Sequence, residues 1–546
     1  MKLKFLFFIC LFFGASVFAQ NSAPDILQRP KLVVGIVVDQ MRWDYLYRFH
    51  ALYASDGGFK RMLNQGFTCE NTMIPYTPTI TAAGHSCIFT GAVPATNGIV
   101  GNIWYDNVKN RAVYCCEDDT AKTVGASDDA GRMSPQNLLV TTVGDELRMA
   151  TNFASKVIGI SLKDRGAILP AGRGANAAYW YDAVNGNFIS SSYYMNELPS
   201  WVKKFNKRNL TDSLYKLNWN LSLSAEVYQQ YCGNDEQPYE RQPFDMNQKH
   251  FPYTLSSFAE KDYSKIAVTP YGNDLLAAMA KAAVVNEDLG KGPVTDFLSV
   301  SFSSPDYIGH TFGPDSWEQM DDLIKLDKVL GDFFTFLDGQ IGKGNYTIFL
   351  TADHGTANSP GYTKLHKLPG GVFREDAFPN TINQLLNVKY NSDKLIIGIF
   401  EYQILLNHKL IDSLKLEEQA IITTIIDYVR QRPEIAQVFA TKDIENAPVT
   451  IVQKEMFRNG YYPNRSGDIQ IVLKPGFVDG DGFGTTHGLW NPYDAHIPLL
   501  WYGWGINHGK TNREVYMTDI APTIAALLHI QMPSGCVGKV LTEVMK

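Results

Sequence analysis

Short apolar segments alternate with amphipathic ones along this chain, and this alternation constrains the fold more than any other feature. The apolar segments are 31–38, 157–162, 297–302, 346–351 and 497–502. Between them, 315–338 carries apolar residues at helical spacing, and 518–528 is a second predicted helix. Strands that are apolar throughout and alternate with helices are typical of a mostly parallel sheet covered on both faces. The sequence therefore predicts an α/β fold built on a doubly wound, mostly parallel sheet.

Two long segments interrupt this alternation. Residues 166–292 are rich in Tyr, Trp, Asn and Ser and show poor periodicity, so we expect an insertion that caps the sheet or packs beside it. Residues 387–464 contain a predicted strand (400–406) and a predicted helix (417–430), which indicates an inserted accessory subdomain. The core would then consist of three segments: 30–165, 293–386 and 465–546.

The N-terminus has the layout of a secretory signal peptide. Lys2 and Lys4 precede an apolar run from Phe5 to Val17, and Ala19 ends a cleavage site of small residues. The alternative is a membrane anchor, but the run is shorter than the roughly 20 residues that span a bilayer. We therefore expect residues 1–19 to be removed. The result would be a periplasmic or secreted protein with no stable membrane anchor after signal cleavage.

Charge and cysteine content argue against some classes of function. The chain of 546 residues has a formal net charge of −7 and no basic stripe, so we expect no nucleic acid partner. The six cysteines after the signal peptide include no C-x-x-C arrangement, which argues against a thiolate zinc site. One or two disulfides are possible outside the cytoplasm, with pairing that the sequence does not assign.

Acidic residues follow three of the predicted strands. Asp39 comes after the first, Asp306 after the third and Asp353 after the fourth. In open α/β sheets, ligands bind at the carboxyl ends of the strands. Turn preference explains a single aspartate at such a position, but three are hard to attribute to it alone. The sequence therefore predicts a ligand site at this edge of the sheet.

Histidines near these aspartates complete two sets of metal ligands. His310 lies four residues after Asp306, on the same side of a helical turn, and His354 adjoins Asp353 before Gly355, which permits a turn. His487 lies in a glycine-rich loop, and alone it would be interpreted as a surface histidine. Five other histidines are predicted to be structural: His50, His366, His408, His496 and His529. Three ligands are thus available for each of two ions: Asp39, Asp306, His310, Asp353, His354 and His487.

A threonine supplies a candidate nucleophile. Thr81 follows a proline-restrained segment and precedes a predicted helix over 82–89, where the helix dipole and free N–H groups favour a phosphoryl group. The alternative is that Thr81 only caps the helix. A threonine hydroxyl needs a metal or a base to activate it. Two ions about 4 Å apart can clamp the oxygens of an in-line displacement, which is chemistry for phosphoryl or sulfuryl transfer.

Together these residues resemble the metal and nucleophile pattern of the alkaline phosphatase superfamily. Three further stretches are similar to the PafA-type periplasmic alkaline phosphatases in particular: 37–45 (VVDQMRWDY), 98–106 (GIVGNIWYD) and 161–172 (SLKDRGAILPAG). The resemblance extends from about residue 29 to the C-terminus.

The resemblance implies a two-zinc phosphomonoesterase that acts on small phosphorylated substrates and works as a monomer. The first zinc would be held by Asp306, His310 and His487. The second would be held by Asp39, Asp353 and His354, with Thr81 as a further ligand that becomes a transient phosphothreonine. Asn102, Lys163 and Arg165 would hold the phosphoryl oxygens. Lys163 and Arg165, two residues apart at the end of a strand, are predicted to share one face.

Four other functions compete with this interpretation. The strongest is a nucleotide pyrophosphatase/phosphodiesterase, which shares the threonine and both metal sites. A sulfatase needs Cys or Ser in a C/S-x-P-x-R context that the chain lacks, and a phosphoethanolamine transferase normally carries several membrane spans. An exported binding protein that has lost catalysis would be expected to lose some of the ligands, whereas Thr81 and all six are present.

Overall fold

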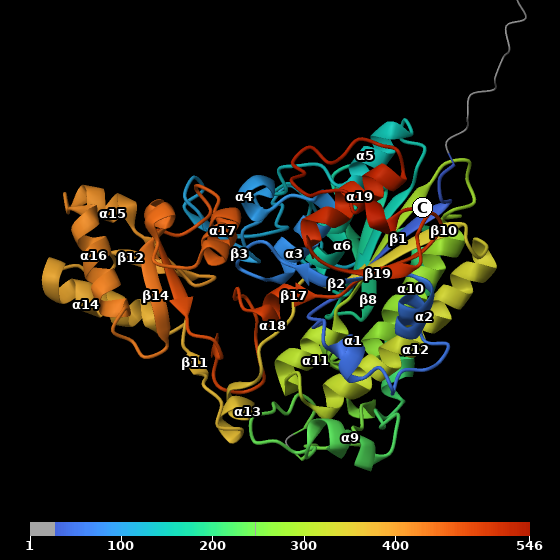
Figure 1. The fold of residues 1–546 in the computed structure, drawn as a ribbon, viewed down its shortest axis with the longest axis horizontal. Coiled ribbons are helices and arrows are strands. Elements are labelled where there is room, and N and C mark those ends of the chain that lie inside the picture. The colour runs from blue at the N-terminus through green and yellow to red at the C-terminus, as the bar shows by residue number, and fades with distance from the viewer. Residues whose placement is uncertain (1–27, 246) are drawn as a thin grey trace, which may run out of the picture.

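The computed structural model describes residues 28–245 and 247–546, in a larger and a smaller lobe (Figure 1). The predicted signal peptide, residues 1–19, lies outside this range. Across the part of the chain that the structure describes, no helix is both long and apolar enough to cross a membrane. The six described cysteines are all free thiols, so the possible disulfides are not formed here.

The larger lobe is built on an 11-stranded sheet whose centre is parallel, which confirms the predicted fold class. In spatial order the parallel strands are β10 (Tyr346–Thr351), β1 (Leu32–Val38), β9 (Asp296–Phe302), β6 (Val157–Ser161) and β7 (Ala177–Asp182). Next to β10 lie β18 (Leu499–Gly503), β2 (Phe67–Met73), β17 (His496–Ile497) and β19 (Gly509–Tyr516); next to β7 lie β8 (Asn187–Ser191) and β5 (Thr123–Val124). The central strands are buried along their whole length, as the uninterrupted apolar runs required.

Two groups of helices cover the two faces of this sheet (Figure 1). One group comprises α3 (Thr81–Thr90), α5 (Val143–Ala150), α6 (Asp164–Ala171) and α19 (Ile520–Leu527). The other comprises α2 (Gly58–Gln65), α10 (Tyr271–Asn286), α11 (Ser304–Phe312) and α12 (Trp317–Gln340). The helices predicted over 315–338 and 518–528 are therefore confirmed as α12 and α19. Helices on both faces make the sheet doubly wound.

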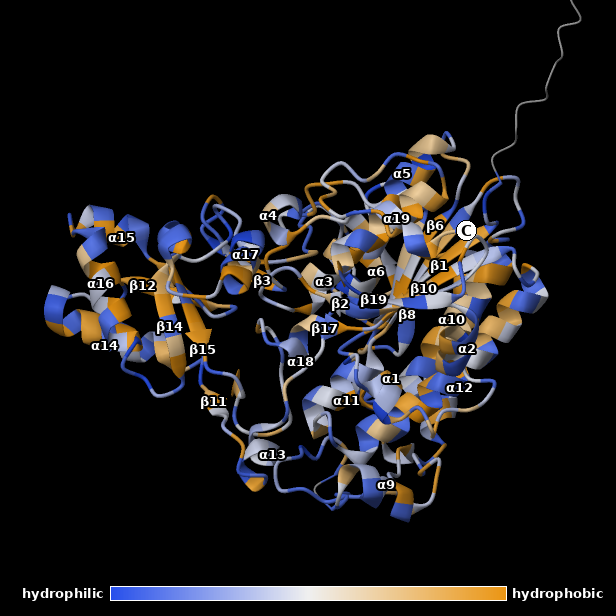
Figure 2. Ribbon diagram, in the orientation of Figure 1, coloured by the Kyte–Doolittle hydropathy of each residue, from blue (hydrophilic) through white to orange (hydrophobic). Residues whose placement is uncertain are grey.

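The smaller lobe has its own antiparallel sheet and hydrophobic core. Its strands, in spatial order, are β12 (Ile396–Phe400), β13 (Gln403–Leu406), β15 (Ile469–Leu473) and β14 (Ile435–Ala440). Its helices include α14 (Phe378–Tyr390), α15 (His408–Ser413) and α16 (Glu418–Val429). Figure 2 shows that the strands of both lobes are mainly hydrophobic. The helix predicted over 417–430 is confirmed as α16.

One predicted element of this lobe is only partly right. The single strand predicted over 400–406 includes the end of β12 at Phe400, a hairpin turn at 401–402, and β13 at Gln403–Leu406. The turn contains Glu and Tyr, which are not turn-forming residues, so the sequence did not mark the reversal. Because the sheet also includes β15 and α14 begins at Phe378, we infer that the accessory subdomain extends beyond 387–464 at both ends.

The segment 166–292 is divided between the central sheet and additional structure. α6, β7, β8 and α10 belong to the layers of the core. Between β8 and α10 lie α7 (Ser200–Asn206), α8 (Leu210–Tyr215) and α9 (Ala225–Cys232). We therefore infer that the insertion begins after β8 and ends before α10. The aromatic residues that made 166–292 appear distinct are partly those of β7, which is buried throughout.

The remaining short elements connect these parts. They are α1 (Tyr45–Arg48), α4 (Pro94–Asn97), β3 (Ile103–Asp106), β4 (Arg111–Tyr114), α13 (Pro360–Leu365), β11 (Gly371–Phe373), α17 (Ile451–Gly460), β16 (Phe477–Asp479) and α18 (Pro492–Ala495). The β3–β4 hairpin projects from the larger lobe toward the smaller one (Figure 1).

Candidate active site

Three neighbouring parallel strands bring the predicted metal ligands together. In the register of β1, Val37 pairs with Thr351 of β10, and Val38 pairs with Phe302 of β9. The carboxyl ends of the three strands therefore lie at one edge of the sheet. Asp39, Asp306 and Asp353 leave the sheet there, as predicted, although Asp306 lies in the first turn of α11 rather than directly after its strand.

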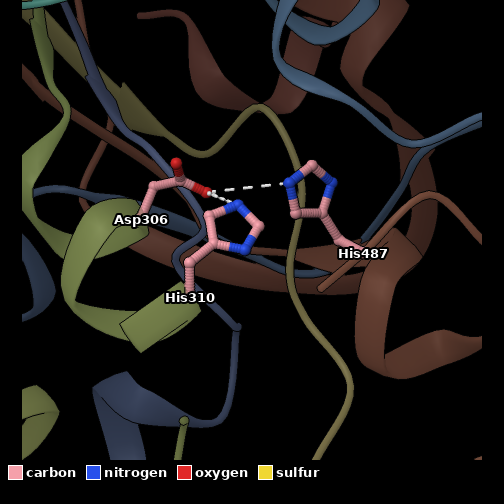
Figure 3. Close-up of side chains that lie close together, drawn as sticks. All are labelled: Asp306, His310 and His487. Carbon is pink, nitrogen blue, oxygen red and sulfur yellow. Dashed lines mark ion pairs between the residues drawn. The ribbon is translucent and has the colours of Figure 1, made fainter. Parts of the chain in front are cut away.

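The first triad consists of Asp306, His310 and His487 (Figure 3). Asp306 and His310 lie one helical turn apart on α11, and the Asp306 Oδ1 to His310 Nε2 distance is 3.1 Å. His487 comes from a loop far along the chain, and its Nε2 lies 3.7 Å from the same oxygen. Gly484 lets this loop approach, because its φ is +61° and a Cβ there would lie 1.9 Å from the backbone O of His310.

The second triad consists of Asp39, Asp353 and His354, all fully buried. The Nε2 of His354 lies 3.5 Å from Asp39 Oδ1 and 3.4 Å from Asp353 Oδ2. The neighbouring Gly355 does not adopt the left-handed backbone that would explain a glycine at the turn. It is needed for close approach instead, because a Cβ there would lie 2.2 Å from the backbone O of Tyr493.

The backbone orients the three imidazoles in the same way. The Nδ1 of His354 lies 2.9 Å from the carbonyl of Gly355, that of His310 lies 2.9 Å from Thr485, and that of His487 lies 2.8 Å from Thr79. Each Nδ1 therefore carries a proton, and each Nε2 faces the carboxylates. Metal-binding histidines are commonly oriented by a backbone carbonyl in this way. Burial lowers the pKa of both His354 and His487, which keeps these rings neutral, as a metal ligand must be. At His310 the nearby Asp306 carboxylate outweighs burial and raises the pKa.

The site holds more negative charge than its own cations neutralise. Burial, together with repulsion from Asp306 and Asp353, raises the pKa of Asp39 well above its usual range. Lys163 lies between the triads, with its Nζ 2.6 Å from Asp39 Oδ2 and 2.6 Å from Asp306 Oδ2. Burial alone would lower the pKa of Lys163, but these two carboxylates raise it, so the ammonium stays charged.

Two buried carboxylate oxygens without a hydrogen-bond partner indicate whether metal ions fit this site. Within residues 28–245 and 247–546, the buried atoms Asp39 Oδ1 and Asp353 Oδ2 have no hydrogen-bond partner. Both face the Nε2 of His354, which offers a lone pair and not a proton. Buried anionic oxygens without a donor are costly, and a cation at this point would satisfy all three atoms. The donor set of carboxylate oxygens and imidazole nitrogens therefore fits a divalent metal ion.

Thr81 lies directly beside the second triad. It is the first residue of α3, it is almost fully buried, and its Oγ1 lies 3.5 Å from His354 Nε2. The residue at the N-cap position is Ile80, so Thr81 does not serve as the helix cap. The alternative role weighed from the sequence is thus wrong, because the helix begins one residue earlier than predicted. Its hydroxyl is free to point at the metal ligands.

The three predicted phosphate contacts come from two segments of the chain. The Oδ1 of Asn102 accepts a hydrogen bond from the backbone N–H of Ala82 (3.0 Å), which directs the amide nitrogen the other way. Lys163 and Arg165 were predicted to share one face of a strand end, and the strand end is wrong. The chain turns out of β6 where Ser161 Oγ accepts the N–H of Lys163 (3.1 Å). Lys163 is then the N-cap of α6 and Arg165 lies in its first turn, so helix and not strand geometry orients their side chains.

Four residues that support this site were not predicted. Gln40 donates its side-chain amide to Asp306 Oδ1 (2.7 Å) and its backbone N–H to Asp353 Oδ1 (3.2 Å). His85 Nδ1 lies 2.8 Å from the carbonyl of Thr81 and 3.3 Å from Asp353 Oδ2. The spacing of four between Thr81 and His85 was a signal that would have identified His85. The left-handed backbone of Gln40 (φ 64°) had no signal in the sequence.

Tyr114 and Tyr307 are the other two. Tyr114 donates its hydroxyl hydrogen to Asp164 Oδ1 (2.5 Å) and accepts a hydrogen bond from Arg165 Nη1 (3.2 Å). The Tyr307 ring lies under the Lys163 ammonium, 5.1 Å from its centroid. Neither tyrosine could be identified from its spacing to other site residues, because both act through contacts between distant segments.

Comparisons with known proteins agree with this geometry. The family model of type I phosphodiesterase / nucleotide pyrophosphatase matches residues 33–494. The chain is 48% identical to the alkaline phosphatase PhoV of Synechococcus elongatus, covering 100% of each chain. It is 46% identical to the alkaline phosphatase PafA of Elizabethkingia meningoseptica, covering 95% of each. The crystal structure of wild-type alkaline phosphatase PafA matches with a TM-score of 0.93 at 45% identity, covering 95% of this chain and 100% of that one.

Proposed function

This chain belongs to the type I phosphodiesterase / nucleotide pyrophosphatase family and is a phosphatase, and we propose that it hydrolyses phosphate monoesters with two zinc ions and Thr81. The matches confirm the resemblance to the alkaline phosphatases that the motifs indicated. The observation that carries the proposal is the pair of carboxylate–imidazole triads beside the buried Thr81 hydroxyl.

The two triads would hold the metal ions. Asp306, His310 and His487 would hold one, and Asp39, Asp353 and His354 the other, with Thr81 completing the second site. Mixed carboxylate and imidazole ligands suit zinc. When bound, the two ions lower the pKa of the Thr81 hydroxyl and offset the negative charge of the phosphate and the leaving oxygen.

Thr81 would carry the covalent step. Its ionised oxygen attacks phosphorus, the ester P–O bond breaks, and the leaving alcohol takes a proton from solvent. A water molecule then cleaves the phosphothreonine and releases inorganic phosphate. Thr81 suits this role because it begins α3, whose free N–H groups and dipole favour a phosphoryl group. His85 fixes the backbone of the nucleophile by donating to its carbonyl.

Asn102, Lys163 and Arg165 would hold the phosphoryl oxygens. The oxygen of the Asn102 amide is occupied by Ala82 N–H, so its NH₂ group is available for substrate. Among the described residues, the buried Nε of Arg165 has no hydrogen-bond partner, and the Nη1 of Arg165 lies 4.0 Å from Asp164 Oδ1. A guanidinium with unused donors next to a phosphate site is a preorganised anion contact.

The alternative activity is that of a nucleotide pyrophosphatase/phosphodiesterase. A monoester dianion carries one more charged oxygen than a diester. Lys163, which lies between the two triads, and Arg165 would match that additional charge. Two relatives, at 48% and 46% identity, are named alkaline phosphatases, which also favours the monoesterase.

We also propose the setting in which the enzyme works. A chain of this kind would act in the periplasm or after secretion, as a monomer, on small phosphorylated substrates. Its relatives are named alkaline phosphatases, which supports an alkaline working range.

A comparison of two substrates tests the proposed activity. The purified protein is expected to release p-nitrophenol from p-nitrophenyl phosphate faster than from bis-p-nitrophenyl phosphate. Metal removal should abolish release, and zinc should restore it. A faster rate with the diester would favour the phosphodiesterase. Recovery with magnesium alone would contradict zinc.

A further inference from the structure

One two-residue turn of the accessory subdomain packs against two glycines of the candidate active site. Glu401 and Tyr402 connect β12 and β13, and the flanking residues Phe400 and Gln403 pair directly. Both turn residues have positive φ, 51° for Glu401 and 63° for Tyr402. Two consecutive left-handed residues are what a type I′ hairpin turn requires, and Asn and Gly are strongly preferred there. Glu and Tyr are unfavourable in that conformation, so something other than turn preference determines these two residues.

The sheet of the subdomain holds this turn in place. The carbonyl of Tyr402 accepts hydrogen bonds from Ile471 N–H (2.9 Å) and from Gln470 Nε2 (3.2 Å). The backbone N–H of Tyr402 points to Glu375 Oε1 at 3.4 Å. The turn is therefore a rigid projection and not a loose loop.

The two side chains of the turn contact two walls of the site. A Cβ on Gly101 would lie 3.2 Å from Glu401 Cγ and 3.4 Å from Glu401 Oε1, so Glu401 packs on the backbone beside Asn102. A Cβ on Gly488 would lie 3.2 Å from Tyr402 Cε2, so the buried Tyr402 ring packs next to the residue that follows His487. Both contacts need a glycine opposite the turn.

The Glu401 carboxylate also faces the backbone of Asn102. The Asn102 N–H and the Arg165 guanidinium both act on it and lower the pKa of that carboxyl. Burial opposes both effects and raises the pKa of Glu401 to about 7, so the group is mainly ionised in the alkaline range.

Two hydrogen bonds hold Asn102, and Glu401 adds a third neighbour. The Asn102 carbonyl accepts the N–H of Cys115 (2.9 Å), and its side-chain oxygen accepts the N–H of Ala82 (3.0 Å). Its own N–H faces the Glu401 carboxylate, which packs on Gly101. The side-chain NH₂ of Asn102 then remains for substrate. Of these neighbours, Glu401 is the one that comes from the subdomain.

We propose that Glu401 is a positioning residue that holds Asn102 in place for the phosphoryl group, and that the Glu401–Tyr402 turn keeps its unfavourable conformation for this purpose. The inference rests on the proposed function, because it takes Asn102 as a phosphate contact. It assigns the accessory subdomain a direct part in catalysis.

Truncation of Glu401 tests the positioning role. Glu401→Ala is expected to lower kcat/KM for p-nitrophenyl phosphate about tenfold, because a displaced contact weakens transition-state binding. Glu401→Gln keeps an acceptor oxygen for the Asn102 N–H and should recover most of this loss. Glu455→Ala, an exposed glutamate of the same lobe, is the matched control and should behave as wild type. Wild-type activity of Glu401→Ala would overturn the inference, as would equal losses in Glu401→Ala and Glu401→Gln.

A double-mutant cycle separates this inference from the proposed function. Asn102→Ala should lower kcat/KM, and adding Glu401→Ala to it should cost little more. Full activity of Asn102→Ala would contradict the role of Asn102 itself, and with it the proposed function at this residue. A loss in Asn102→Ala with fully additive effects would refute only the positioning by Glu401.

Replacement of the turn gives the sharpest test. The variant Glu401→Asn/Tyr402→Gly carries the preferred type I′ sequence, so it is expected to raise the Tm while it lowers kcat/KM at least as much as Glu401→Ala. A rise in Tm with unchanged kcat/KM would mean that the strained turn has no catalytic purpose. An unchanged or lower Tm would contradict the strain argument.

Discussion

The histidines of the two lobes differ in what their ring nitrogens contact. In the active site, His354, His310 and His487 each turn one nitrogen to a backbone carbonyl and the other to carboxylates of a triad. In the subdomain, His408 has a carboxylate on each side, Glu418 at 3.0 Å from Nδ1 and Asp468 at 2.9 Å from Nε2. At His354 and His487 the first arrangement leaves lone pairs facing acids without a proton between them, whereas the arrangement at His408 is satisfied by protonation.

The pKa directions follow this difference. Burial lowers the pKa of His354 and His487, which stay neutral. Hydrogen bonding to Asp468 raises the pKa of His408 to about 9, so this ring is charged near neutral pH. A histidine that is buried, neutral and faces orphaned carboxylates is therefore a ligand candidate, and one held between two carboxylates is a structural ion pair. Substitutions in the active site and in the subdomain test this distinction.

The largest effect is expected at Thr81 and His354. Thr81→Ala and His354→Ala should both lower turnover by several orders of magnitude, because the first loses the nucleophile and the second loses a metal ligand. Only His354→Ala should lose bound metal. Since Thr81 is not a helix cap, Thr81→Ala should leave the Tm almost unchanged. Kinetics and metal analysis of both proteins check this, and metal loss in Thr81→Ala would contradict the separation.

The second largest effect is expected in the rate at which metal leaves the two triads. The side chain of His310 is 36% exposed, whereas Asp39, Asp353 and His354 are fully buried. A chelator should therefore remove metal in two phases, the first from the triad of Asp306, His310 and His487. His310→Ala should abolish the fast phase and keep the slow one. Metal content and activity followed over time give the result, and a single phase in the wild type would show that the sites are not distinct.

A smaller effect is expected at Arg165, because it lies outside both triads. Arg165→Ala should lower kcat/KM for the monoester roughly 10- to 100-fold and for the diester much less, since the monoester carries the additional charge. Lys163→Ala is a less clean test, because Lys163 also neutralises Asp39 and Asp306. Arg430, 61% exposed on the subdomain, provides the control Arg430→Ala. Equal losses for both substrates would leave the monoester preference without this cause.

Features that depend on local patterns could be predicted from the sequence, and contacts between distant segments could not. The buried strands and the aspartates after them follow from local patterns, so the sheet was predicted, and the structure brings the six candidate ligands together in two groups. The pairing of His487 with α11 needed the family resemblance, because a loop far along the chain has no local signal for its partner. The position of Arg165 was wrong because one hydrogen bond, from Lys163 N–H to Ser161 Oγ, ends the strand early.

The contacts between the lobes were beyond sequence reasoning. The turn between β12 and β13 contains Glu and Tyr and no Gly or Asn, so neither the hairpin nor the approach of Glu401 to Asn102 was anticipated. Such contacts depend on tertiary packing that local periodicity does not encode.

The smallest effect is expected from His408, and it appears as a change in stability with pH. The folded pKa of about 9 lies above the usual value of 6.5, so the ion pair stabilises the protein fully below pH 6.5. This contribution declines as the pH rises and is lost above about 9. Because the ring is 38% exposed, solvent screening limits the contribution to about 1 kcal/mol. Urea denaturation of wild type and His408→Gln should therefore differ at pH 6 and converge at pH 10. A difference that stays constant with pH would mean that packing, and not charge, is what His408 contributes. The buried His354 and His487 give the contrasting case: because their pKa values are lowered, their effect has the opposite sign, and stability should fall as the pH drops below about 6.5.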